Sequence, residues 1–303
     1  MDLFVPTLSQ GLLWSILALG VYLTFRVLDI ADLTVEGSFP LGAAVAARLI
    51  DGGSAPLFAI FAACLAGMCA GAVTGWLTTK LKIPALLAGI LTMIALYSVN
   101  LRVMGKANLS LLRRDTIFTG FSGLFADRQL AVLLVGCVAV LLLSLLFYWF
   151  FGTEIGAAIR ATGFNPHMIR ANGVNTDVTV ILGLLLSNGL VAISGALVAQ
   201  SNGFADVGMG VGTIVIGLAS VIIGEVLFGA DGFLKLLFGA NTFLICLISV
   251  ILGSVVYRAV IALVLEMGMP PNDLKLFTAI LVGAALALPL LQKKLQTARK
   301  AVK

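Results

Sequence analysis

The sequence predicts an all-α, polytopic integral membrane protein, and three observations lead to this fold class. Of the 303 residues, 60% are apolar and only 11% are charged, whereas soluble domains average about 45–50% and about 25%. Mean hydropathy is +1.13, so too little polar sequence remains to cover a soluble fold of this length. About nine long apolar stretches, with a range of about eight to ten, follow one another along the chain, as lipid-facing helices require.

Each predicted span is a run whose length is close to the roughly 20 apolar residues that cross a bilayer core. No Pro- or Ser-rich linker separates the runs, so we expect a single transmembrane domain over 1–303. With boundaries good to about 4 residues, the spans are expected at 8–28, 38–50, 56–79, 84–104, 129–151, 178–200, 207–229, 236–264 and 275–291.

The third span carries glycine at a regular spacing. Gly67, Gly71 and Gly75 recur every four residues and therefore share one face of a helix. Small residues at this spacing let membrane helices approach closely. We expect this face to pack against another helix.

Basic residues indicate which ends of the spans face the cytoplasm. Five of the 19 Lys and Arg lie in the tail 293–303, and positive charge favours the cytoplasmic side, beside anionic lipid headgroups. With this tail and the loop 152–177 inside, 11 Lys and Arg fall inside and 8 outside. We therefore expect the N-terminus outside and the C-terminus inside. The first apolar stretch lacks the basic region and cleavage site of a signal peptide, so it is expected to remain as a helix.

The second span is predicted to be a broken helix. Only 12 residues, 39–50, precede Asp51 and the two glycines after it, which gives about 18 Å of helix against a core about 30 Å thick. We expect Ser38 to cap this helix and Pro40 to lie in its first turn. The stretch before it would then be non-helical at membrane depth, where it must be buried in protein or line a wet cavity.

Three acids fall in that stretch within eight positions. Acidic side chains are costly at membrane depth and mark paths for solutes. Two interpretations remain open: the acids line or brace a translocation path, or the first span is shorter and they lie in an ordinary cytoplasmic loop. The first interpretation predicts that the path residues are Asp29, Asp32, Glu36 and Ser38.

The polar loop 152–177 is predicted to begin with a short helix, at about 154–162. Glu154 places a negative charge in its first turn, where the helix dipole favours one. Gly163 is expected to end the helix in the left-handed conformation.

A second short helix, at about 166–171, is predicted to follow in the same loop. Asn165 is expected to be its N-cap and Pro166 its first residue. The Asn172-Gly173 pair is expected to close it, and Thr176 with Asp177 to cap the next span. A loop with this much local structure can present a rigid knob to a partner, or it can simply pack on its own bundle.

The pattern E-x-G-A-A-x-R-A-x-G, from Glu154 to Gly163, resembles the coupling-loop signature of bacterial ABC importer permeases. It is followed by NP, by NGVNTD, by a span ending SNGLVAISGALVAQ, and by GFADVGMGVGTIVIGLASVIIGE. This order is similar to the permease superfamily of branched-chain amino acid and ribose importers. The stretch RVLDIADLTVEGSFPLGAAV resembles the tryptophan- and tyrosine-import branch. The resemblance covers about residues 10–290.

The resemblance implies an assembly in the bacterial cytoplasmic membrane. Two permease copies, expected to be a homodimer, form the path, and two cytosolic ABC ATPases bind the coupling loops. An external binding protein delivers a small solute, with an aromatic or other amino acid as the expected class. The chain would be a translocation subunit without enzymatic activity or a cofactor of its own. ATP and Mg²⁺ would bind the ATPase, since this sequence has no G-x-x-x-x-G-K-[ST] loop. The implied coupling residues are Glu154, Gly156, Arg160, Gly163, Asn165, Pro166, Arg170 and Gly173.

The loop 105–128 lies on the expected outer side and carries four basic residues, although positive charge is disfavoured there. We expect Arg113 and Arg114 to dock an acidic rim of the binding protein. The alternative is an ordinary solvated loop.

Other functions leave no comparable pattern. An ion- or proton-coupled secondary transporter is the alternative function, but it predicts ionisable groups at mid-membrane and often matching halves, and we detect no clear repeat. A membrane-embedded hydrolase needs a base beside Ser or Cys, and the lone His167 lies in the polar loop 152–177. The four cysteines lack metal-ligand spacing, so no metal site is expected. The sequence has no basic stripe of the kind that binds nucleic acid.

Overall fold

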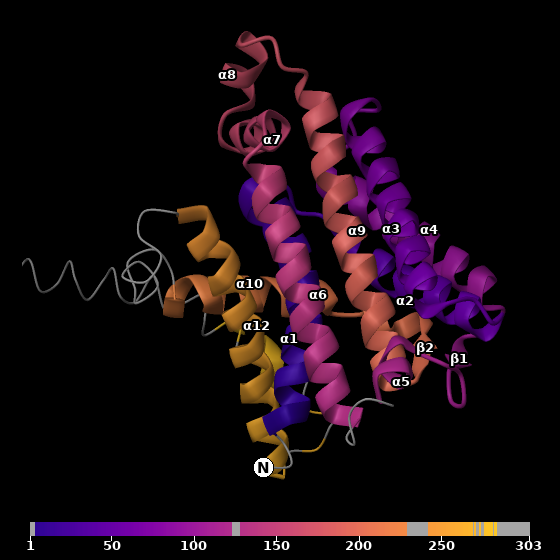
Figure 1. Ribbon diagram of the computed structural model, residues 1–303. Coiled ribbons are helices and arrows are strands. Elements are labelled where there is room, and N and C mark those ends of the chain that lie inside the picture. Colours follow the sequence, from indigo (N-terminus) through magenta and orange to yellow (C-terminus); the bar gives the residue numbers. More distant parts are fainter. Residues whose placement is uncertain are drawn as a thin grey trace, which may run out of the picture.

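The computed structural model describes residues 4–122, 128–228 and 242–268, together with 270, 273, 276–280 and 282–283, and most of them are helical (Figure 1). The first half comprises α1 (Phe4–Tyr22), a π-helical turn (Leu23–Val27), α2 (Val35–Asp51), α3 (Pro56–Thr79), α4 (Ala85–Met104), β1 (Asn108–Ser110), α5 (Ile117–Ser122) and α6 (Arg128–Phe151). The second half comprises α7 (Glu154–Phe164), α8 (Pro166–Ala171), α9 (Thr176–Asn202), β2 (Phe204–Asp206), the 3₁₀ helix η2 (Val207–Gly210), α10 (Thr213–Phe228) and α12 (Thr242–Glu266).

Within the described ranges, seven helical segments are long and apolar enough to cross a membrane. The helix α2 is shorter, with 17 residues, and the ninth predicted span, 275–291, lies largely outside the described residues. The predicted helical membrane fold is therefore confirmed, while a total of nine spans stays a prediction. Leucine and phenylalanine side chains on the outer faces of α3, α4 and α6 are exposed, as expected of surfaces that contact lipid.

The long helix α9 lies at the centre of the bundle and contacts α1, α2 and α3 (Figure 1). The predicted glycine face of α3 makes one of these close contacts. A Cβ atom on Gly75 would lie 2.9 Å from the Cα of Ile181, and one on Gly71 would lie 2.7 Å from the carbonyl carbon of Leu184. The expectation that this face packs on another helix is confirmed, and its partner is α9.

The predicted break in the second helix lies at a different place. The helix α2 runs without interruption from Val35, and Ser38 is inside it instead of capping it. Pro40 also lies in the interior, beyond the first turn. The non-helical backbone is the connection 28–34 between the π-helical turn and α2. The helix α2 begins earlier than predicted because Thr34 already has helical backbone geometry. No side chain caps this start.

Pro40 lies inside α2, and another segment packs against the carbonyl group that this proline leaves without a helical partner. Proline has no N–H, so the carbonyl oxygen of Glu36 loses its helical partner. Gly210 of η2 lies directly against that oxygen, and a Cβ atom on Gly210 would also lie 2.7 Å from the Cδ of Pro40. A glycine is thus required where η2 crosses the first turns of α2.

The segment after α4, predicted as a polar loop over 105–128, has structure of its own. The strands β1 and β2 pair antiparallel, with Leu109 opposite Ala205. The short helix α5 follows, and its Phe118 is fully buried. Figure 1 places this sheet and α5 at the end of the bundle away from α7 and α8.

We predict that Gly71→Val lowers the stability of the purified protein, because even a Cβ atom at this position overlaps the backbone of α9. Overpacking of this kind costs about 1–3 kcal/mol. The matched control is Gly136→Val in α6, where a Cβ atom would be 3.5 Å from its nearest neighbour. Thermal unfolding in detergent measures the effect. Equal unfolding midpoints for the two variants would contradict the close contact.

Candidate translocation and coupling site

The helices α7 and α8 lie at the opposite end of the bundle from the N-terminal end of α1 (Figure 1). Their side chains fix where they begin. The hydroxyl group of Thr153 accepts from the N–H of Gly156 at the start of α7, and the Asn165 side chain accepts from the N–H of Met168 at 3.0 Å. Pro166 is the first residue of α8. The predicted N-cap and first turn of the second short helix are confirmed.

The end of α8 is also as predicted, whereas the cap of the next span is not. Asn172 is the C-cap, and Gly173 follows with a φ of 83°, a conformation suited to glycine. The N-cap of α9 is Asn175, whose side chain accepts from the N–H of Asp177 at 3.0 Å. Thr176 and Asp177 are therefore the first helical residues. An asparagine is as good a cap as threonine or aspartate.

Gly163 does not end α7, so that prediction was wrong. The helix continues to Phe164, and Gly163 is not among the residues with positive φ. A glycine is needed at this position because the backbone of another segment lies very close to it. A Cβ atom there would lie 2.8 Å from the Cα of Leu28 and closer still to the carbonyl oxygen of Val27. The backbone of α7 thus rests directly on the chain at the end of the π-helical turn.

Of the other three expected coupling residues of α7, one packs on the bundle and two lie at the surface. Gly156 packs on Phe151, where a Cβ atom would lie 2.5 Å from the Cα. The Arg160 guanidinium lies 5.3 Å from the ring centroid of Phe243, a cation–π distance. Glu154 is exposed in the first turn.

Arg170 ties α8 to the start of α9. Its Nε donates to the hydroxyl of Thr176 at 2.9 Å, and its guanidinium lies 4.0 Å from Asp177. Lys80 and Lys82, which follow α3, also lie within 4.0 Å of the same carboxylate. Exposed pairs of this kind typically contribute about 0–1 kcal/mol each. They orient the loop more than they stabilise it.

The sequence did not predict the most exposed apolar group of this loop. Phe164, at the junction of α7 and α8, is 91% exposed, and Met168 beside it is 50% exposed. A residue just before an N-cap often packs on the helix that follows, and the phenylalanine does not. The only signal in the sequence was a large apolar residue between Gly163 and Asn165.

The connection 28–34 runs from α7 into the interior of the bundle. At its start Leu28 is buried against Gly183 of α9, where a Cβ atom would lie 3.1 Å from the leucine Cγ. Asp29 is exposed and has a φ of 56°. Of the four expected path residues it is the exposed one.

Asp32 is 2% exposed and is held by hydrogen bonds from both neighbouring elements. Its Oδ1 accepts from the N–H of Thr34 at 2.9 Å, and its Oδ2 accepts from the amide of Asn188 at 2.7 Å. Asn188 is 12 residues after the first residue of α9, which is about 18 Å along the axis. None of the ion pairs among the described residues includes Asp32.

Polar side chains from four helices or connections surround this bond. Ser38 donates to the carbonyl oxygen of the Asn188 side chain at 2.6 Å, so both ends of that amide are paired. The hydroxyl of Thr34 bonds that of Thr74 at 2.7 Å, which donates to Thr92 at 2.9 Å. The structure therefore brings Asp32 and Ser38 together through an asparagine that the sequence analysis did not select.

Glu36 points toward a separate cavity. Its Oε1 accepts from the N–H of Gly212, just before α10, at 3.0 Å. A cavity of about 350 Å³ lies between the first turns of α2, the second half of α4 and the segment 207–211, and Tyr97 and Asn100 line it together with Glu36. The acids are thus divided among solvent, a buried polar cluster and a cavity.

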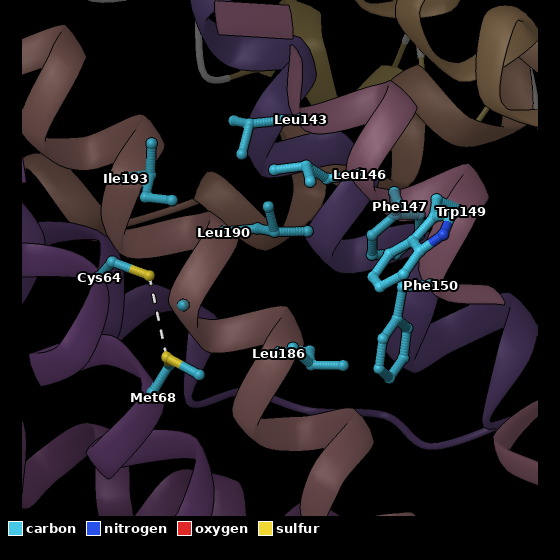
Figure 2. A pocket seen from close by; sticks show the side chains of 11 residues that line it. Cys64, Met68, Leu143, Leu146, Phe147, Trp149, Phe150, Leu186, Leu190 and Ile193 are labelled. Carbon is cyan, nitrogen blue, oxygen red and sulfur yellow. Dashed lines mark hydrogen bonds between the residues drawn. The ribbon is translucent and has the colours of Figure 1, made fainter. Parts of the chain in front are cut away.

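A second hollow is unsuited to a polar solute. Figure 2 shows a groove between α3, α6 and α9 whose lining is almost entirely apolar, with the sulfur atoms of Cys64 and Met68 and the indole nitrogen of Trp149 as its heteroatoms. Its only marked contact joins the Cys64 thiol to the Met68 sulfur at 3.8 Å. Grooves of this composition suit lipid chains. We therefore exclude it from the translocation path.

The two arginines that were expected to dock the binding protein differ in their contacts. Arg114 donates to Asp51 at 2.9 Å, whereas Arg113 is exposed and has a φ of 67°. Within the described residues no group of three His, Cys, Asp or Glu could hold a metal ion.

The family model described as "Branched-chain amino acid transport system / permease component" matches residues 3–287. The chain belongs to this permease family. It is 40% identical to a tyrosine transport system permease protein of Clostridioides difficile, over 93% of this chain and 90% of that protein. It is 26% identical to the autoinducer 2 import system permease protein LsrC of Salmonella typhimurium, over 72% and 61% of the two chains.

One solved structure, described as an inward-facing conformation of a proposed metal-chelate type ABC transporter, covers 96% of this chain and 85% of its own with a TM-score of 0.48 and 13% identity. The family match and the tyrosine permease confirm the resemblance expected from the coupling loop. The chain is accordingly a multi-pass permease of the cytoplasmic membrane, a transport component and not a catalytic one.

We predict that Asn188→Asp destabilises the permease, because it removes the amide that donates to Asp32 and places a second carboxylate there. A buried group left unsatisfied costs about 1–3 kcal/mol. The double variant Asp32→Asn with Asn188→Asp restores an amide beside a carboxylate. It should unfold at a higher temperature than Asn188→Asp alone, with a coupling energy of about 0.5–3 kcal/mol. Strictly additive losses would argue against a direct bond.

Proposed function

We propose that the chain is the membrane-spanning subunit of an ATP-driven importer, which moves a small solute that an external binding protein delivers. The observation that carries this proposal is the backbone contact between Gly163 of α7 and residues Val27 and Leu28. It joins an exposed pair of short helices to a connection that enters the bundle without helical structure, residues 28–34. Such a contact is what a coupling loop needs.

The proposed assembly contains two copies of the permease, two cytosolic ABC ATPases and the binding protein. ATP and Mg²⁺ belong to the ATPases, and this chain binds no cofactor. The exposed Phe164 and Met168 would fill an apolar groove of the ATPase. Exposed aromatic groups at a tip are common anchors of protein interfaces.

In this proposal, movement passes from α7 to the bundle without any side-chain rearrangement at the first step. Because α7 touches backbone and not a flexible side chain, a shift of α7 displaces Leu28 by a comparable amount. Leu28 is buried on α9, and the connection leads on to Asp32 and its bond to Asn188. The path ends at the first turns of α2, beside the cavity that Glu36 lines.

An amino acid, and an aromatic one in particular, is the solute that we propose. The 40% identical relative is described as a tyrosine transport permease. A cavity of about 350 Å³ is within the usual range of about 300–1,000 Å³ for small-molecule sites. Uptake of radiolabelled tyrosine by proteoliposomes that contain permease, ATPase and binding protein tests this substrate directly. Uptake that needs ATP supports the proposal, and absence of uptake for every amino acid tried would remove it.

An ion- or proton-coupled secondary transporter is the second candidate. One observation favours it: neither Asp32 nor Glu36 takes part in any ion pair among the described residues, and acids within membranes often carry protons. The two candidates differ in one measurement. Uptake that persists in vesicles without any ATPase, and that follows a proton gradient, would replace the first proposal by the second.

We predict that Gly163→Val uncouples transport from ATP hydrolysis while the ATPase still binds. The added side chain overlaps Val27 and Leu28, which lie on the bundle side of α7, and leaves the exposed tip unchanged. The matched control is Ala157→Val, which adds a β-branched side chain at an exposed position of the same helix. Pull-down of the ATPase and uptake assays are compared. Normal uptake by Gly163→Val would refute the contact as a coupling element.

We predict the reverse pattern for Phe164→Ser. This substitution removes the exposed apolar tip and should reduce recovery of the ATPase in pull-downs by about tenfold or more, since anchor residues are worth about 2 kcal/mol. The control is Phe204→Ser in β2, at the other end of the bundle, which is 43% exposed. Unchanged recovery with Phe164→Ser would show that the ATPase docks elsewhere.

We predict that Arg113→Glu weakens docking of the binding protein, mainly at low ionic strength, because exposed charges act on association rates and are screened by salt. Arg114→Glu should have the additional effect of breaking the pair with Asp51, so the double variant is the less specific test. Affinity is measured at two salt concentrations. Identical affinities for wild type and Arg113→Glu at low salt would rule out this surface.

A further inference from the structure

The cavity beside Glu36 combines polar groups on one wall with apolar groups on the others. Glu36, Ser98 and Asn100 are its polar lining residues, and Tyr97 adds an aromatic ring. The remaining lining is largely apolar, with Pro40 and Met93 among its members. The groups come from three elements far apart in sequence, so the fold and not a local motif assembles them.

Glu36 lacks a cationic partner at this place. One carboxylate oxygen accepts from the N–H of Gly212 at 3.0 Å. The described ion pairs join other acids, namely Asp51, Asp177 and Glu225, to lysine or arginine, and Glu36 is in none of them. The cavity therefore presents an acid that only a neutral backbone group touches.

Asn100 provides the second, independent observation. It is 0% exposed, and its amide nitrogen donates to the carbonyl oxygen of Gly37 at 3.2 Å. Its side-chain oxygen is buried and has no partner within the part of the chain that the structure describes. Buried acceptors are normally satisfied. A donor on a bound molecule would satisfy this one.

An ammonium group meets these requirements together. It carries a positive charge for Glu36 and three N–H donors, of which one can serve the oxygen of Asn100. The face of the Tyr97 ring attracts cations and also packs on flat apolar groups. A carboxylate in the same place would be repelled by Glu36 and would offer Asn100 no donor.

We propose that this cavity binds the ammonium end of a primary-amine solute, with Glu36 and the Asn100 oxygen as its polar contacts and Tyr97 against its body. The inference rests on the proposed function, since it describes how an imported amino acid is held on its way through the permease. It selects amino acids and amines over sugars and over organic acids that lack an amine.

The first experiment measures the charge preference of the cavity without any substrate. The four cysteines, Cys64, Cys69, Cys137 and Cys246, are replaced by serine, and Ser98→Cys, in the lining of the cavity, supplies one thiol while Tyr97 is kept. The rates of labelling by the cationic aminoethyl and the anionic sulfonatoethyl methanethiosulfonate reagents are compared. Addition of Glu36→Gln should lower the ratio of cationic to anionic rate by about threefold or more, the effect of one nearby charge through water. An unchanged ratio overturns the proposal.

The second experiment keeps Glu36 and therefore does not depend on that variant folding. Tyramine and tyrosine should slow the labelling of Ser98→Cys, whereas 3-(4-hydroxyphenyl)propionate, which has the same ring and no amine, should not. The control Asp177→Asn, which removes an acid outside the cavity, should leave this protection intact. Equal protection by all three compounds, or protection by none, overturns the amine site.

The importer proposal and the amine-site proposal can be refuted independently of each other. Uptake that requires ATP, together with a labelling ratio and protection that do not respond to amines, would retain the importer and remove the amine site. Amine-specific protection in a protein that imports no amino acid would retain the site and remove the proposed substrate.

Discussion

The hydrogen bond between the Asp32 carboxylate and the Asn188 amide is the constraint on which the arrangement of the membrane helices depends. Non-helical backbone inside a bilayer must find partners within the protein. The same carboxylate also accepts from the backbone of Thr34 and so closes the connection just before α2 begins. Because Ser38 uses the other end of the Asn188 amide, α2 is held at a fixed height on α9.

Two functional regions lie on opposite sides of that attachment. Toward α7 the connection 28–34 meets the helix through backbone contact at Gly163. On the other side, Glu36 reaches the N–H of Gly212 and the cavity beside it. The pairing of Arg26 with Glu225, at 2.7 Å, further joins the π-helical turn to α10. In the proposed coupling, a displacement of α7 would therefore reach both α2 and α10, the helix that begins beside the cavity.

The sequence predicted those features that short segments determine. The caps at Asn165 and Pro166, the turn at Gly173 and the glycine face of α3 follow from neighbouring residues, and the structure has them. The predictions for Gly163 and Ser38 failed because their roles depend on chain that is distant in sequence. Asn188 is 156 positions from Asp32, and no spacing rule relates them. The unpaired oxygen of Asn100 could likewise be recognised only after α2 and α4 were packed.

The exposed tip at Phe164 has a consequence for how the protein is made. Before an ATPase is present, the tip would project a phenylalanine and a methionine into the cytosol, where chaperones and proteases recognise apolar segments. A subunit synthesised in excess over its ATPase would then be the first to be degraded. Turnover would keep the subunits in proportion even if their genes were expressed unequally.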